Sequence, residues 1–261
     1  MKFLILQVAC LYTSVASAMA VTSAASSETL TKTSLKLDYF DARGAAETSR
    51  LLLALAGAEY DDSRFAITPG TMESPDFTKS KESGKLVMNM NRAPVLTVQE
   101  EDGVSVTMGQ SKAIERYLAR RFGLMGSSEL ESAQIDCISE HCRDIRDAQM
   151  RKRFTPFVRD RSEEEKERDR KEWFESDMPT MLKNLEKAIA KTSKAKGCAV
   201  GDSISLADLS IFSMLKDGFP AYQEATLSAA KDCNVLLEII EAVESNPRIS
   251  AWLKSRPQTN F

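Results

Sequence analysis

The chain has 261 residues, of which 43% are hydrophobic and 28% are charged, as is ordinary for a soluble globular protein. This length predicts one or two domains with a core of useful size. The formal net charge is −3, and Lys and Arg are interspersed with Asp and Glu. The charge pattern therefore argues against a nucleic-acid-binding protein.

Residues 1–20 have the pattern of a secretory signal peptide. Lys2 gives a positive start, residues 3–11 form an apolar run, and Ala-x-Ala sites follow. The run is too short to cross a bilayer, so we expect no membrane span after leader removal. A presequence of the usual Arg-rich kind fits less well. We expect the secretory pathway or secretion, with a plastid address led by a signal peptide as the alternative.

Residues 21–33 are rich in Ser, Thr and Ala and are predicted to be a flexible lead-in. Residues 35–40 then alternate apolar with polar side chains, which is typical of a strand. Leucines recur near the helical period over residues 45–58, so a helix is predicted there. A second strand is expected over residues 60–67.

The next segments complete an α/β domain over residues 34–122. Residues 75–77 open a short, weakly determined element. A β-branched run at 94–98 and a second run at 104–108, separated by turn residues, predict a hairpin. A helix is predicted over 111–121. The order strand, helix, strand, variable element, hairpin and helix indicates a thioredoxin-like N-terminal domain.

Strand signals nearly vanish beyond a short linker near residues 123–128. Residues 128–261 are predicted to form an all-α C-terminal domain, in which residues 205–208 (Ser-Leu-Ala-Asp) form a capping box that begins a helix. The helical patterns are at 129–153, 163–193, 206–219, 233–245 and 247–255.

The cysteines indicate neither metal binding nor thiol redox catalysis. Those beyond the leader are Cys137, Cys142, Cys198 and Cys233. An oxidising compartment would allow them to pair, but their spacing resembles neither a CxxC motif nor a zinc site, so no metal is expected. None lies in the thioredoxin-like domain, which argues against a thiol–disulfide oxidoreductase.

Short motifs in the first domain could carry chemistry. Tyr39 ends a strand before a helix, where its hydroxyl could face a cleft or simply pack. If the peptide bond before Pro94 is cis, Ala93 turns its backbone outward to pair with a peptide ligand; an ordinary trans proline is the alternative. Ser111 could help a helix start to hold a carboxylate, or could merely cap the helix.

In this order and spacing, the motifs resemble the glutathione transferase family, in its sigma-like, tyrosine-dependent class. The resemblance lies in Tyr-Phe-x-x-Arg-Gly-x-Ala-Glu at 39–47, Gln-Ser-x-Ala-Ile-x-Arg-Tyr-Leu at 110–118, Ser-x-Ala-Asp at 205–208 and the tail at 246–259. It covers residues 34–261. It implies the glutathione transferase fold, glutathione as co-substrate, a small apolar electrophile as second substrate, a role in detoxification, and a homodimer.

The resemblance makes Tyr39 the catalytic residue, whose phenol donates a hydrogen bond to the glutathione sulfur. A free thiol titrates near pH 8.5 and attacks as the thiolate, so such a bond would lower the thiol pKa. By the same resemblance, Ala93 pairs its backbone with the cysteinyl part of glutathione, with Pro94 cis. Arg92 would lie near the glycyl carboxylate.

Gln110 and Ser111 match the residues that hold the γ-glutamyl end in the family. Asp144 matches an acidic side chain that related dimers send to the γ-glutamyl amine at the neighbouring subunit. Two positions depart from the sigma-like pattern: Ala45 replaces an arginine that helps to position the tyrosine, and Phe77 stands near the place of a tryptophan. A non-catalytic binding protein and a glutathione-dependent isomerase or peroxidase are the alternative functions.

Overall fold

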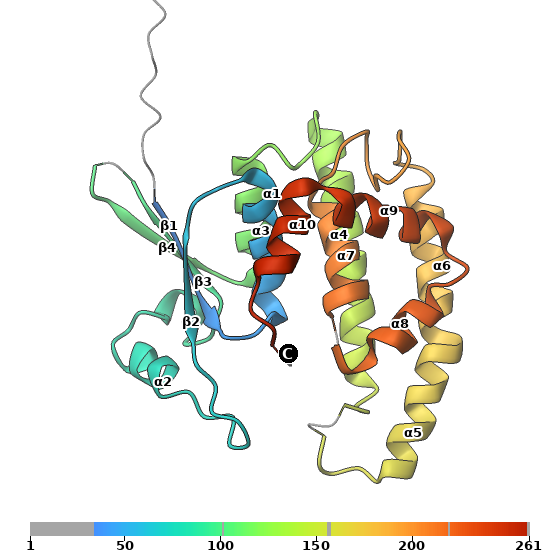
Figure 1. Ribbon diagram of the computed structural model, residues 1–261, viewed down its shortest axis with the longest axis horizontal. Coiled ribbons are helices and arrows are strands. Elements are labelled where there is room, and N and C mark those ends of the chain that lie inside the picture. The colour runs from blue at the N-terminus through green and yellow to red at the C-terminus, as the bar shows by residue number, and fades with distance from the viewer. Residues whose placement is uncertain (1–33, 101, 156–157, 219, 260–261) are drawn as a thin grey trace, which may run out of the picture. The chain divides into compact units, whose positions relative to one another are not determined.

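The computed structural model describes residues 34–100, 102–155, 158–218 and 220–259 (Figure 1). The predicted signal peptide and lead-in lie outside these residues. The described chain starts with an α/β part and continues as a series of helices. Both halves of the predicted fold class are therefore present.

The α/β part is built on a mixed four-stranded sheet in the order β2-β1-β3-β4. β1 runs parallel to β2 and antiparallel to β3, and β3 runs antiparallel to β4. The parallel pair needs a crossover, which a helix supplies. The strands are β1 (Ser34–Phe40), β2 (Asp61–Phe65), β3 (Val95–Gln99) and β4 (Ser105–Gly109).

Helices α1 (Glu47–Ala56) and α3 (Ser111–Arg121) pack together beside the sheet, and α2 (Pro75–Glu82) lies apart from them (Figure 1). The prediction for α3 is confirmed at both ends. α1 ends at Gly57, whose φ of 66° is the left-handed conformation that glycine adopts without steric cost. A 3₁₀ turn at Val87–Asn89 leads from α2 towards β3.

The remaining chain is helical, as predicted. Its helices are α4 (Glu129–Arg151), α5 (Glu163–Glu172), α6 (Met178–Ile189), α7 (Leu206–Phe212), α8 (Gln223–Ala229), α9 (Asn234–Ser245) and α10 (Pro247–Ser255). The single helix expected over 163–193 is divided into α5 and α6 by a π-helical turn at Trp173–Asp177. A second π-helical turn, Ser213–Asp217, continues α7. α8 has no counterpart among the predicted helices.

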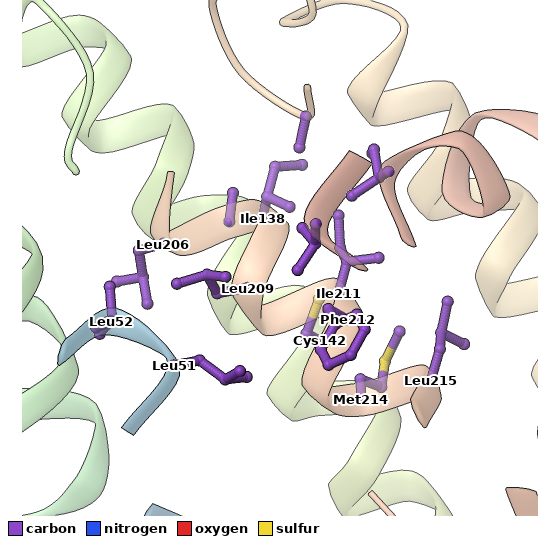
Figure 2. Packing of buried hydrophobic residues seen from close by; sticks show 14 of the residues in the cluster. Leu51, Leu52, Ile138, Cys142, Leu206, Leu209, Ile211, Phe212, Met214 and Leu215 are labelled. Atoms are coloured by element: carbon purple, nitrogen blue, oxygen red, sulfur yellow. The ribbon is translucent and has the colours of Figure 1, made fainter. Parts of the chain in front are cut away.

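Every residue of α7 is buried, and this helix is the centre of the core. Figure 2 shows Leu52 of α1 beside Leu206 of α7, and the same buried cluster includes Leu51 of α1 and Ile138 and Cys142 of α4. Fully burying a leucine side chain stabilises the fold by about 1.5–3 kcal/mol. Because α1 contributes to the same hydrophobic cluster as α4 and α7, the two parts share one core.

The predicted capping box at the start of α7 is confirmed. Asp208 accepts the Ser205 backbone N–H at 2.8 Å and its hydroxyl at 2.7 Å. The same carboxylate accepts the Ala199 N–H at 2.6 Å, which joins the preceding loop to the helix. Burial raises the pKa of Asp208 to about 6, although these hydrogen bonds act in the opposite direction.

The cysteines are all free within the described chain. Burial raises the pKa of the Cys142 thiol to about 12, so it is inert at neutral pH. Within these residues, no helix combines the length and the apolarity that crossing a bilayer requires. The same residues contain no group of three or more His, Cys, Asp or Glu placed to hold a metal ion.

Candidate active site

The predicted site motifs meet at one edge of the sheet. Backbone pairing places Asp38, Val95 and Gly109 in one row across β1, β3 and β4. The next residues towards the edge come one from each motif: Tyr39, Pro94 and Gln110. The register of the sheet therefore brings together residues that are far apart in the sequence.

The hydroxyl of Tyr39 is held from the loop that follows β1 (residues 41–46). The backbone N–H of Ala45 donates a hydrogen bond to the phenol oxygen at 3.0 Å. This contact uses a lone pair of the oxygen, so the phenol proton stays available for donation to a ligand. Gly44 permits the approach, because its φ is 40° and a Cβ there would lie 2.5 Å from the phenol oxygen.

Arg50 supports the same loop from behind and was not predicted. Its side chain is 0% exposed, and its guanidinium donates to the Ala42 carbonyl at 2.7 Å. It also pairs with Asp62 at 3.1 Å and with Glu47 at 3.4 Å, and lies 5.8 Å from the centre of the Tyr39 ring. A cation at this distance is attracted to the ring face. The sequence signal was the pair Glu47 and Arg50, three residues apart on a leucine-rich helix.

The Ala93–Pro94 peptide bond is cis, as expected for the site. Asn89, which is 4% exposed, connects this bond to the next strand. Its amide nitrogen donates to the Pro94 carbonyl at 2.8 Å, and its amide oxygen accepts the Gln110 N–H at 3.1 Å. Asn89 was not predicted; the only signal was an amide inside an otherwise apolar run.

Gln110 and Ser111 form the start of α3. Gln110 is the N-cap with φ 67°, and its side chain makes no capping bond; Ser111 is the first helical residue, so the alternative that Ser111 is the N-cap is wrong. Within the described chain, neither side chain has a hydrogen-bond partner. A helix start presents unpaired N–H groups and partial positive charge. Together these groups can bind a carboxylate.

Arg92 directly precedes Ala93 at the site, whereas Asp144 lies on α4. Arg92 is exposed, with its Nε 3.4 Å from the Asn89 carbonyl, and no carboxylate of the described residues pairs with it. Its charge is therefore available to an anion. Asp144 is exposed on α4, beside a cavity of about 200 Å³ that His141 and Met181 also line. The structure does not bring Asp144 to the sheet edge, and its role at a neighbouring subunit stays a prediction.

Phe77 packs into a small aromatic cluster beside the site. Its ring centre lies 4.7 Å from that of Phe40 and 5.7 Å from that of Phe65. Leu86 and Val95 belong to the same buried cluster. Phe77 therefore supports the strand that ends at Phe40, the residue after Tyr39.

This mixed sheet, with a tyrosine, a cis-proline and a helix start at one edge and a helical part behind it, defines the glutathione transferase fold. The family model described as "Glutathione S-transferase, N-terminal domain" matches residues 35–120. The model described as "Glutathione S-transferase, C-terminal domain" matches residues 148–256.

Individual relatives agree with the family models. The chain is 31% identical over 226 residues to glutathione S-transferase 3 of Caenorhabditis elegans, covering 87% of this chain and 98% of that protein. It is 32% identical over 234 residues to hematopoietic prostaglandin D synthase of Gallus gallus, covering 86% and 97%. A solved sigma class glutathione transferase of Fasciola hepatica matches with a TM-score of 0.67 and 28% identity, covering 88% and 99%. The chain therefore belongs to the glutathione S-transferase family, and it is a glutathione transferase.

Proposed function

We propose that this protein conjugates glutathione to small apolar electrophiles and that Tyr39 activates the glutathione thiol. The observation that carries the proposal is the hydrogen bond from the Ala45 N–H to the Tyr39 oxygen. It leaves the phenol proton free, at the edge where the cis-proline and the start of α3 meet. The Tyr39 phenol is thereby a single hydrogen-bond donor at the sheet edge where the peptide would bind.

The charges around this edge match the ends of glutathione, which carries a carboxylate at each end. Gln110, Ser111 and the start of α3 would hold the γ-glutamyl carboxylate. Arg92 would pair with the glycyl carboxylate. The backbone of Ala93, before the cis bond to Pro94, would pair with the cysteinyl residue between them.

Tyr39 would act by stabilising the thiolate. A hydrogen bond to a charged group contributes about 1.5–3 kcal/mol, and one unit of pKa corresponds to about 1.4 kcal/mol. A single phenol donor therefore accounts for a thiol pKa lowered by about one to two units. The thiolate then attacks an electrophilic carbon, forming a carbon–sulfur bond as a leaving group departs or a double bond is saturated.

A conjugation assay with a generic aryl halide tests the proposal. Tyr39→Phe removes the donor and keeps the ring, so we expect glutathione affinity to stay nearly unchanged and conjugation to fall at least about tenfold, as for the loss of one charged hydrogen bond. Equal rates for the two proteins at neutral pH would reject the role of Tyr39.

A glutathione-dependent isomerase or peroxidase is the second candidate, and the identity to hematopoietic prostaglandin D synthase favours considering it. All of these reactions begin with the same thiolate, and the fate of glutathione separates them. A transferase gives a thioether, an isomerase returns glutathione unchanged, and a peroxidase gives glutathione disulfide. Mass spectrometry of the glutathione product would distinguish the three.

We also propose that the protein enters the secretory pathway and forms a homodimer. Residues 1–20 support entry into the secretory pathway, which sequencing of the mature N-terminus would test. The family resemblance supports a homodimer, with Asp144 near the glutathione of the neighbouring subunit. Light scattering of the purified protein would test the dimer.

A further inference from the structure

We propose that the C-terminal segment (residues 252–259) positions Tyr39 through a buried charge network centred on Arg256. The inference rests on the proposed role of Tyr39. We call this set of residues the tail network: Arg43, Glu47, Asp217, Trp252, Arg256 and Thr259. They come from the β1–α1 loop, the start of α1, the turn after α7 and the end of the chain.

Arg256 holds two carboxylates at once. Its guanidinium forms two parallel contacts of 2.9 Å with Asp217, and a third of 2.8 Å with Glu47. The side chains of Glu47 and Asp217 are each 1% exposed. Burial lowers the pKa of Arg256, but hydrogen bonds and charge from Asp217 and then Glu47 outweigh this effect and raise it. One cation from the tail thus joins two buried carboxylates.

The tail also makes contacts that do not involve Arg256. The Trp252 indole N–H donates to Glu47 at 3.0 Å. Arg43, in the β1–α1 loop, donates to Asp217 at 3.0 Å and to the Thr259 carbonyl at 2.9 Å. Figure 1 shows α10 beside α1, with the end of α10 near the start of α1. The loop and the first residue of α1 are therefore both fastened to the C-terminal segment.

These contacts lie on both sides of Ala45, whose N–H binds the Tyr39 oxygen. Ala45 lies between Arg43 and Glu47 in the sequence, and its N–H is the group that binds the Tyr39 oxygen. The second oxygen of Glu47 contacts Arg50, which holds the Ala42 carbonyl and lies against the Tyr39 ring. A shift of the tail network would therefore move both the N–H donor and the cation that surround the phenol.

The arrangement explains how the loop works without the arginine that sigma-like relatives have at position 45. An alanine side chain cannot reach the phenol oxygen, so only a fixed backbone can supply the donor. Removing one partner from a network of buried charges is costly, because it leaves an uncompensated charge. The tail network can thus hold the Ala45 N–H against Tyr39. If the tail network had a purely structural role, its loss would lower the stability of the protein without changing the thiol pKa.

The test compares Arg256→Met with Lys254→Met, an exposed residue of the same segment without an ion pair in the described chain. We would measure the pKa of the bound glutathione thiol from thiolate absorbance, together with glutathione Kd, kcat and KM. Arg256→Met should raise that thiol pKa by about one unit, with kcat lowered several-fold and Kd changed less than about twofold, since the carboxylate-binding groups are untouched. Arg256→Lys should fall between, because an ammonium cannot replace the guanidinium fork. Lys254→Met should match the wild type.

Two less disruptive variants test the inference in case Arg256→Met does not fold. Asp217→Asn keeps the shape and removes one charge, and Trp252→Phe removes the indole donor to Glu47 and keeps an aromatic ring. Both variants should raise the pKa of the bound glutathione thiol, as Arg256→Met does. Circular dichroism and thermal unfolding would show whether each variant is folded. Folded variants with the wild-type thiol pKa would overturn the inference. A wild type that binds glutathione without lowering its thiol pKa would instead reject the proposed role of Tyr39.

Discussion

The phenol oxygen of Tyr39 has two neighbours that determine its position and its hydrogen bonding. The Ala45 N–H occupies one lone pair, and Gly44 leaves the space in which the hydroxyl lies. Both are backbone effects, so the identity of the side chain at position 45 matters less than its N–H. An alanine at that position therefore leaves the N–H contact to Tyr39 in place.

We predict that Gly44→Ala impairs catalysis more than folding. The new methyl group would lie 2.5 Å from the phenol oxygen and displace it. We expect kcat/KM for conjugation to fall at least about tenfold, as for one lost charged hydrogen bond. Gly84→Ala is the matched control, because Gly84 also has positive φ but nothing lies within 4 Å of its added Cβ. Equal kcat/KM in both variants would contradict this role of Gly44.

Asn89 is a second residue-scale test, at the glutathione-binding side. Asn89→Ala removes the two hydrogen bonds that join the Pro94 carbonyl to the Gln110 N–H. Each bond contributes about 1 kcal/mol, so we expect the loss of both to raise glutathione Kd, measured by calorimetry, by up to about thirtyfold. Asn91→Ala, at an exposed neighbour, should leave Kd unchanged. An unaltered Kd in Asn89→Ala would show that the edge is held by other contacts.

At the scale of elements, helix ends were predictable where a residue type marks them. The helix over Ser111–Arg121 and the helix over Pro247–Ser255 begin and end as predicted. The π-helical turns at Trp173–Asp177 and Ser213–Asp217 were not, because no residue type in the sequence marks a π-helical turn. α8 was missed since its seven residues are too few for a clear helical period.

The start of α4 gives a pH-dependent prediction. Glu131 accepts hydrogen bonds from Lys194 at 2.6 Å and from the Ser127 N–H at 2.8 Å, which lower its pKa from 4.5 to about 2. A carboxyl whose pKa is lowered in the folded state stabilises the fold above its unfolded value and loses that contribution as pH falls. The stabilisation by Glu131 should therefore disappear between pH 4.5 and about 2.

Urea unfolding of Glu131→Gln and wild type would check this behaviour. The variant should be less stable at neutral pH, and the difference between the two proteins should become small as the pH falls to about 2, the folded pKa at which Glu131 loses its charge. A difference that stays constant over that range would mean that the charge of Glu131 contributes nothing.

At the scale of the whole molecule, the motifs were visible in the sequence but their connections were not. Tyr39, Pro94 and Gln110 could be proposed as site residues because the order and spacing of their motifs resemble those of a known family. Arg50 of α1 pairs with Asp62 of β2, and Glu47 pairs with Arg256 over a separation of 209 residues. No period or spacing encodes such a pair, since it depends on how α10 packs against α1.

We propose that the Tyr39 phenol stabilises the thiolate of bound glutathione. The most direct measurement is a pH titration of thiolate absorbance for glutathione bound to the wild type and to Tyr39→Phe. We predict that the wild type shifts the thiol about one to two units below its free value near pH 8.5, and that Tyr39→Phe returns it close to that value with little change in Kd. Superimposable titration curves for the two proteins would contradict the account.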